Sequence, residues 1–284
     1  MSLPVFNTYF DNKYFVDVFL SKETALNWTA STKDKWIRIS EQSGTLNPQK
    51  NESRIWISID PASVPAKEHF QGTVTFAAGK KKIRLSVPVF NPPASELKNF
   101  AGFVENDGLI SIKASSFSKQ TGAGARKWTC VEGLGRSGNV MMAQPFLSDV
   151  SSINQDSTKS GPVLEYDFYS FSNATPEVKV FTLPTHPLNN LFSNRYAVSI
   201  DNGPLTVLDF KTVGRSAEWK QNVLQNQAVR SFKAGNVGPG KHTLKIYMID
   251  PGVAVDRILI DLGGLKQANS VIPETVKLKK SDAK

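Results

Sequence analysis

The sequence predicts an all-β protein built as two tandem β-sandwiches, an immunoglobulin-like module followed by a jelly-roll module. Apolar residues alternate with polar ones in short runs, which is the period of strands that bury one face. Gly, Pro, Asn and Asp interrupt these runs about every 8 to 12 residues, as in sandwiches. Helical periodicity is nearly absent, and 284 residues suffice for two separate apolar cores.

The first module is predicted over residues 1–92. Alternating runs at 14–20, 55–59 and 83–89 can each bury one face against a partner sheet. In the middle run, Trp56 faces away from the isoleucines on either side of it. Residues that favour turns separate the runs, at Ser43-Gly44, Asp60-Pro61 and Ala78-Gly79-Lys80. This pattern is typical of an immunoglobulin-like sandwich.

A linker is predicted over residues 93–99. The sequence Asn91-Pro92-Pro93-Ala94-Ser95 interrupts the strand pattern. Adjacent prolines remove two hydrogen-bond donors and bias the chain toward an extended conformation. We therefore expect the domain boundary here.

The second module is predicted over residues 100–270 as a jelly roll of about eight strands. Asp201-Asn202-Gly203 and Gly238-Pro239-Gly240 predict hairpin turns, and hence antiparallel pairing. The stretch from Ser216 to Gln225 predicts a short helix with Ser216 as its N-cap. The expected strands are 109–114, 163–171, 177–183, 196–200, 243–248 and 254–261.

A basic tail is predicted over residues 271–284, and its end from Lys277 to Lys284 is expected to be solvated. That end contributes to a formal net charge of +9, and the rest of the excess is spread thinly along the chain. Thinly spread basic charge attracts a polyanionic polysaccharide as well as a nucleic acid, so charge alone does not choose between them.

No apolar run approaches the roughly 18 to 20 residues of a membrane helix. The first residues, MSLPVFNTYF, lack the basic and apolar regions of a signal peptide. The single cysteine, Cys130, allows no internal disulfide, and we expect it to be buried.

Several phrases of the second module, in order and spacing, resemble the C-terminal module of glycoside hydrolase family 115, the xylan α-1,2-glucuronidases. The first module is similar to the sandwich that precedes this region in those enzymes. The phrases are GLGRSG at 133–138, LEYDFY at 164–169, RYAVSID at 195–201, GKHTLKI at 240–246, MIDPGV at 248–253 and ILID at 258–261.

The resemblance implies a non-catalytic accessory region of a glucuronoxylan-processing α-glucuronidase. The α/β catalytic domains of the family have no counterpart in this sequence, so no catalytic residue is carried over. The implied partners are a polysaccharide and an upstream catalytic domain or a dimer mate, with no nucleic acid and no membrane. The implied location is periplasmic or secreted. The alternative is an autonomous carbohydrate-binding module for xylan or another plant polysaccharide, and the chain is either a fragment or a complete gene product.

No cofactor is expected. The family and related jelly-roll modules tend to begin this domain with Glu-Ala-Glu-His, whose carboxylates can bind a structural calcium. Here the same place reads Lys113-Ala114-Ser115-Ser116, and a lysine repels a hard cation. Only Asp256 and Asp261 remain as weak candidates for calcium ligands.

Sugar recognition needs flat aromatic faces beside directional polar groups. Arg126 and Trp128 offer both in the loop 122–128, and the arginine suits a uronic carboxylate. Glu218 and Trp219 form a second candidate cluster. Either tryptophan could equally belong to the core.

Other chemical motifs have simpler interpretations. Glu165 and Asp167 lie on one face of a predicted strand, but no sugar cleft is evident around this pair of acids. The three histidines lack the spacing of metal ligands. The glycines of GLGRSG at 133–138 are followed by no helix, so they predict a turn and not a nucleotide site.

Overall fold

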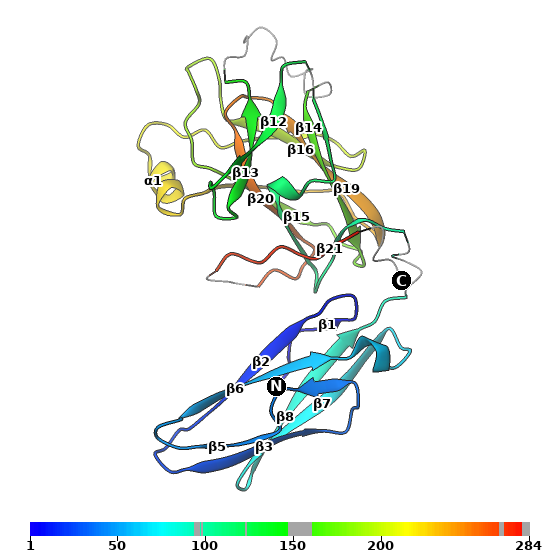
Figure 1. Cartoon of the computed structure of the whole chain (residues 1–284). Coiled ribbons are helices and arrows are strands. Elements are labelled where there is room, and N and C mark those ends of the chain that lie inside the picture. The colour runs from blue at the N-terminus through cyan, green and yellow to red at the C-terminus, as the bar shows by residue number, and fades with distance from the viewer. Residues whose placement is uncertain (94–96, 98, 123, 147–160, 267–269, 280–284) are drawn as a thin grey trace. The chain divides into compact units, whose positions relative to one another are not determined.

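The computed structural model describes the chain except residues 94–96, 98, 123, 147–160, 267–269 and 280–284. The chain divides into two compact units, Met1–Glu96 and Leu97–Lys284, and the division falls inside the predicted linker (Figure 1). Strands dominate both units, which confirms the all-β prediction. No helix among the described residues is long and apolar enough to cross a bilayer.

The first unit is a sandwich of a five-stranded and a three-stranded sheet. The larger sheet has the order β1 (Phe6–Asn7), β8 (Lys81–Phe90), β7 (His69–Ala78), β3 (Leu26–Thr32) and β5 (Ser43–Leu46). The smaller sheet has the order β2 (Lys13–Phe19), β6 (Glu52–Ile59) and β4 (Ile37–Ile39).

Alternation along β6 shows why these residues form a sandwich. Ile55 and Ile57 are fully buried between the sheets, whereas Trp56 is 43% exposed on the outer face. Trp56 there meets Phe15 of β2 edge to face, with ring centroids 5.4 Å apart. The sequence placed these side chains correctly because a strand turns successive side chains to opposite faces.

The predicted turn at Ser43-Gly44 is wrong, because both residues lie in β5. Gly44 is the cross-strand partner of Trp28, and a Cβ added to it would stand 2.8 Å from the indole nitrogen. The glycine therefore makes room for a buried tryptophan ring. The other two predicted turns are present, one capped by Asp60 and one with Gly79 at φ +56°.

The second unit is a sandwich of larger sheets (Figure 1). One has the order β12 (Lys127–Glu132), β13 (Asn139–Gln144), β20 (Ala254–Asp261), β15 (Glu177–Thr182) and β18 (Ala228–Lys233), with β10 (Leu109–Lys113) also paired to β20. The other has the order β17 (Thr206–Asp209), β16 (Arg195–Ile200), β19 (Gly240–Met248), β14 (Val163–Ser170), β9 (Gly102–Val104) and β21 (Lys277–Leu278), with β11 (Lys119–Thr121) paired to β14.

The six strands predicted for this unit are all present, and one apolar core joins the two sheets. The predicted short helix is α1 (Ala217–Leu224), and the Ser216 side chain caps it by accepting a hydrogen bond from Trp219 N. The turn at Asp201 connects the antiparallel strands β16 and β17, as predicted. Short strands such as β9, β11 and β17 raise the number above the expected eight.

Gly238-Pro239-Gly240 is not a hairpin turn, so that prediction is wrong. Gly238 and Pro239 lie between β18 and β19, which belong to different sheets, and Gly240 is the first residue of β19. Local turn signals indicate where the chain reverses, but not whether the two strands become hydrogen-bonded neighbours.

The prediction of a solvated basic tail is wrong for its first part. Residues 277–278 form β21 on β9, and Thr275 N donates to Ser111 O. The Lys277 ammonium donates to the carbonyls of Ser116 and Phe117 at 2.7 and 3.1 Å. Burial lowers the pKa of Lys277, against the opposing charge of Glu274. Residues 280–284 lie outside the described part of the chain.

Candidate functional site

The structure places the first predicted sugar-contact pair largely inside the fold. Trp128 is 2% exposed, belongs to the core of the second unit, and donates its indole N–H to Pro162 O at 3.3 Å. The ring therefore offers no face to a sugar, and of the two interpretations left open by the sequence the core one holds. Arg126 Nη2 donates to the carbonyls of Met248 and Ile249 at 3.3 and 2.9 Å. Burial lowers the Arg126 pKa, against the charge of Asp250.

Trp219 lies on α1, a helix with no buried residue. The indole is partly exposed and stacks on the imidazole of His186, with ring centroids 5.8 Å apart and planes 14° from parallel. The helix begins at the Ser216 cap, and this fixes the turn that presents Trp219. The imidazole therefore lies against one face of the indole, and the stack joins two rings from separate segments.

Glu218 flanks this surface and forms an ion pair. Its Oε1 accepts a hydrogen bond from Arg230 Nη2 at 2.6 Å, and Arg230 Nε donates to the carbonyl of Asp209 at 2.7 Å. Arg230 lies on β18, so the pair ties the exposed helix to the sheet. Both side chains keep accessible surface, 49% for Glu218 and 27% for Arg230.

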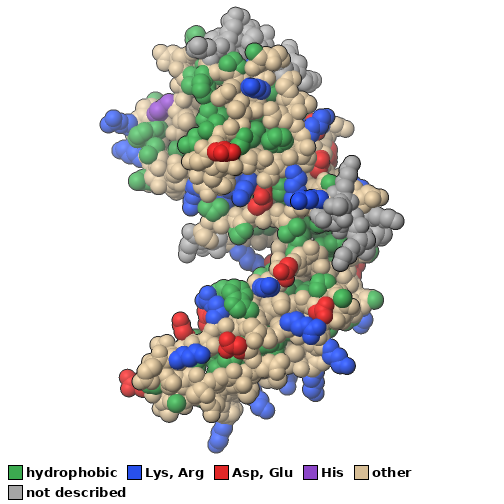
Figure 2. Space-filling view, viewed as in Figure 1, with side chains coloured by type: hydrophobic (Ala, Val, Ile, Leu, Met, Phe, Trp, Pro, Cys, Tyr) green, Lys and Arg blue, Asp and Glu red, His purple; other side chains and the backbone are tan. Residues whose placement is uncertain are grey.

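Together these residues form the Trp219 platform, defined here as Trp219, His186, Glu218 and Arg230. An aromatic face packs against the C–H face of a pyranose, and charged groups beside it supply donors and acceptors for hydroxyls or a carboxylate. Figure 2 shows Lys and Arg side chains beside a histidine at the edge of the second unit where α1 lies. The sequence missed His186 because it is far from Trp219 along the chain.

Several exposed apolar side chains lie close in sequence to the platform residues. Leu188 follows His186 and is 46% exposed, while its Cγ would lie 3.1 Å from a Cβ added to Gly252. Gly252 has φ +81°, so this tight turn between β19 and β20 suits glycine and seats the loop after β15. The exposed neighbours in sequence are Leu191, Val213, Val223 and Leu224.

A comparison with protein families decides what kind of module this is. The model of the glycosyl hydrolase family 115 C-terminal domain matches residues 102–274, which is more than half of the chain. The chain belongs to this family. The resemblance drawn from the phrases of the second module is thereby confirmed.

Solved structures give further comparisons. A family GH115 4-O-methyl-α-glucuronidase with specificity for decorated arabinogalactans is 30% identical, with a TM-score of 0.39, over 51% of this chain and 17% of that one. A family 35 carbohydrate-binding module from Clostridium thermocellum is 16% identical, with a TM-score of 0.37, over 53% of this chain and 97% of that one. This chain thus spans about a sixth of the first similar protein. No curated protein matches it.

The two weak calcium candidates in this family 115 domain already have donors around them. Asp256 accepts hydrogen bonds from the backbone N–H groups of Arg136 and Ser137 at 3.2 and 3.1 Å. Asp261 accepts from those of Gly263 and Leu265 at 2.9 and 3.1 Å. Backbone N–H groups compete with a cation for carboxylate oxygens, so both aspartates have structural roles. The described residues contain no group of three or more metal-ligating side chains.

Glu165 and Asp167 in the family 115 domain lie on β14 and have partners. Lys119 Nζ is 3.8 Å from Glu165, and Thr243 donates its hydroxyl to Asp167 at 2.8 Å. His242 is bonded on both ring nitrogens, to Asp201 and to Gly238 O. The expectation that Cys130 is buried is wrong, because it is exposed on β12, at the end of its sheet.

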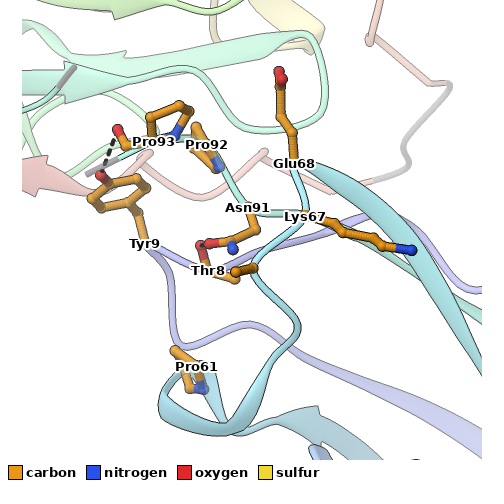
Figure 3. Close-up of a pocket in the computed structure, with 9 residues that line it drawn as sticks. Thr8, Tyr9, Pro61, Lys67, Glu68, Asn91, Pro92 and Pro93 are labelled. Carbon is orange, nitrogen blue, oxygen red and sulfur yellow. Dashed lines mark hydrogen bonds between the residues drawn. The ribbon is translucent and has the colours of Figure 1, made fainter. Parts of the chain in front are cut away.

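The first unit has a shallow pocket of about 470 Å³ near its C-terminal end (Figure 3). Pro61, Pro92 and Pro93 line it, and Tyr9 donates its hydroxyl to Pro93 O. The charged side chains of Lys67 and Glu68 point away from one another (Figure 3). Two of its polar side chains are bonded to each other, since the Thr8 hydroxyl donates to Asn91 Oδ1 at 2.8 Å.

Proposed function

We propose that the chain is the non-catalytic accessory region of a glucuronoxylan-processing α-glucuronidase, and that the Trp219 platform contacts the polysaccharide. The observation that carries the first part is the family 115 C-terminal domain match over residues 102–274. The stacked rings of Trp219 and His186 support the second part. The partner that performs the cleavage is a catalytic domain of the same enzyme.

The proposed sugar contacts follow from the chemistry of the platform. The indole of Trp219 packs against a pyranose ring, and the Glu218–Arg230 pair meets its hydroxyls. Arg126 remains a candidate through the part of its guanidinium that is not bonded to Met248 and Ile249. A location in the periplasm or outside the cell fits a polymeric plant substrate.

Affinity electrophoresis through glucuronoxylan tests the binding role. We expect the wild type to be retarded and Trp219→Ala to lose about fivefold in affinity, since a stacked aromatic face contributes on the order of 1 kcal/mol. Trp56→Ala is the matched control, because it removes a half-exposed tryptophan from the first unit. His186→Ala should weaken binding in the same direction as Trp219→Ala.

Several outcomes would contradict the proposal. Equal retardation of the wild type and Trp219→Ala would exclude the platform as the contact. No retardation by any polysaccharide, with arabinogalactan included as a second plant polymer, would leave only a scaffold role. Release of 4-O-methylglucuronic acid by this chain alone would overturn the non-catalytic assignment.

An autonomous carbohydrate-binding module is the second candidate function. It is favoured by the compactness of the second unit, which has its own core. It predicts that residues 97–284 expressed alone retain the full affinity of the whole chain, whereas a cleft completed by the catalytic domain predicts weak binding without that domain. Dimerisation, the other accessory role, predicts a molecular mass in solution that doubles with concentration.

A further inference from the structure

A β-bulge in β20 puts two charged side chains next to each other at the same sheet position. Val255 pairs with Thr182 and Arg257 pairs with Phe181, so Asp256 is an extra residue without a partner on β15. Val255 and Ile258 belong to the core, while the Arg257 guanidinium carbon lies 4.1 Å from the centroid of the Phe181 ring. Bulges re-aim side chains and are common next to binding sites.

Arg257 is buried without an acceptor. It is 7% exposed, and its Nε and Nη1 have no hydrogen-bond partner among the described residues. Its neighbour Asp256 is occupied by the N–H groups of Arg136 and Ser137 and by the Ser137 hydroxyl. Buried charged donors without acceptors are rare and costly, because their hydration is lost and not replaced. Burial lowers the pKa of Arg257, against the opposing charge of Asp256.

A pocket of about 170 Å³ adjoins this guanidinium, which we call the Arg257 pocket. Arg257, Arg136 and Lys113 line it with positive charge, and Glu274 is its one carboxylate. Glu274 is already bonded, since its Oε1 accepts a hydrogen bond from Lys113 N at 2.9 Å. Glu274 and the neighbouring Asp256 offset only two of these three positive charges, and the remaining positive charge favours an anionic ligand.

The size of the pocket limits which ligands it can bind. A volume of about 170 Å³ corresponds to about five or six water molecules, which is too small for an oligosaccharide. It has room for a carboxylate with a few attached atoms. A planar guanidinium matches a planar carboxylate with two parallel hydrogen bonds, so Arg257 favours this group over a neutral hydroxyl.

We propose that the Arg257 pocket binds the carboxylate of a sugar acid, a uronic acid carried on the polysaccharide or free in solution. The sugar-acid part of this assignment rests on the proposed function. The pocket is a separate site from the Trp219 platform and shares no residue with it.

Thermal denaturation of the full chain with glucuronic acid tests the pocket. Glucuronate should raise the melting temperature in a saturable way, since a ligand that binds only the folded state stabilises it. Glucose, which lacks the carboxylate, should not. Arg257→Met keeps the side chain over Phe181 but removes the charge, and should reduce glucuronate affinity about tenfold to hundredfold.

The variants also separate a binding role from a structural one. Without ligand, Arg257→Met should be at least as stable as the wild type, because it removes a buried cation whose Nε and Nη1 have no acceptor within the described part of the chain. Arg136→Met removes charge from the pocket lining and should weaken glucuronate binding even if Arg257→Met folds poorly. Arg54→Met, which removes an arginine stacked on Phe15 in the first unit, is the matched control and should leave the glucuronate effect unchanged.

Four results would overturn the assignment. The first two are that glucuronate raises the melting temperature of the wild type and Arg257→Met equally, or raises neither. The third is a marked loss of stability in Arg257→Met. The fourth is that acetate stabilises the wild type as much as glucuronate does, which would indicate a protein carboxylate as the natural ligand. Failure of the proposed function can be distinguished from failure of the pocket assignment. If glucuronate stabilises the chain but no polysaccharide retards it, the Trp219 platform is not a polysaccharide contact, while the pocket assignment stands. Xylan oligomers that carry glucuronate test whether a uronate attached to the polymer binds in the pocket.

Discussion

Arg195 binds Asp250 through two guanidinium nitrogens and through its backbone N–H. Its Nε and Nη2 donate to the two carboxylate oxygens of Asp250 at 2.9 and 3.0 Å, and its N–H donates to the same carboxylate at 2.8 Å. Asp250 is fully buried two residues after β19 ends, and Asp250 N donates in return to Arg195 O. The pair therefore fixes the turn that leads to Gly252, which lies against Leu188 in the loop after β15.

Asp250→Ala should destabilise the second unit by about 3 kcal/mol, because it leaves a partly buried guanidinium without its counter-charge. Chemical denaturation followed by tryptophan fluorescence measures this. Lys119→Ala is the control, since it breaks a surface pair at 3.8 Å and should cost about 1 kcal/mol or less. Equal losses in the two variants would contradict the structural role of the clamp.

Gly135→Ala should destabilise the second unit more than Gly133→Ala. Both glycines have φ near +75°, so alanine pays the same backbone strain of about 1 to 2 kcal/mol at either position. Only at Gly135 would the added Cβ stand 2.3 Å from an oxygen of Asp256, whereas nothing lies within 4 Å at Gly133. Thermal denaturation of the two variants gives the comparison, and a larger loss for Gly133→Ala would show that the turn does not hold Asp256.

Removal of residues 271–284 should cost about 3 kcal/mol of unfolding free energy. The truncation deletes the acceptors of Ser111 N and Lys113 N, which are Thr275 Oγ1 and Glu274 Oε1, and the bonds of Lys277. Each such hydrogen bond contributes about 1 kcal/mol. A chain that ends at Lys279 keeps all these contacts and is the matched control. Equal denaturation midpoints for the two truncated chains would show that residues 271–279 add no stability and behave as a solvated tail.

Asp209 should make the second unit lose stability in acid. Burial alone would raise the pKa of Asp209, but hydrogen bonds from the Ser193 hydroxyl and the N–H groups of Lys211 and Asn194, with the charge of Arg195, lower it overall. A lowered folded-state pKa gives stability that is complete above the unfolded value near 4 and is lost as pH falls through the folded value.

Asp209→Asn tests this pH dependence. The difference in unfolding free energy between wild type and variant should be largest near neutral pH and shrink below pH of about 4, where the wild-type carboxylate takes up a proton. Ser193→Ala should move that decline to higher pH, because it removes one donor. A difference that stays constant from neutral to acid pH would show that the folded state does not favour the ionised form.

Local patterns in the sequence determined the strand-rich class, the cap at Ser216 and the outward direction of Trp56. These depend on the two-residue period of a strand and on hydrogen bonds within a few residues, so neighbours along the chain suffice to predict them. The phrases of the second module also identified the family, because they keep their order and spacing.

Contacts between distant segments decided the rest. Whether a tryptophan is buried in the core or exposed at the surface depends on which other segments pack against it. Trp128 is buried in the core, whereas Trp219 stacks on His186. The bulge at Asp256, the clamp of Arg195 on Asp250 and the docking of Lys277 depend on strand register and on long-range pairing. Strand register and long-range pairing depend on the free energy of the whole folded unit, to which segments far apart in sequence contribute. For that reason only the tertiary structure could determine them.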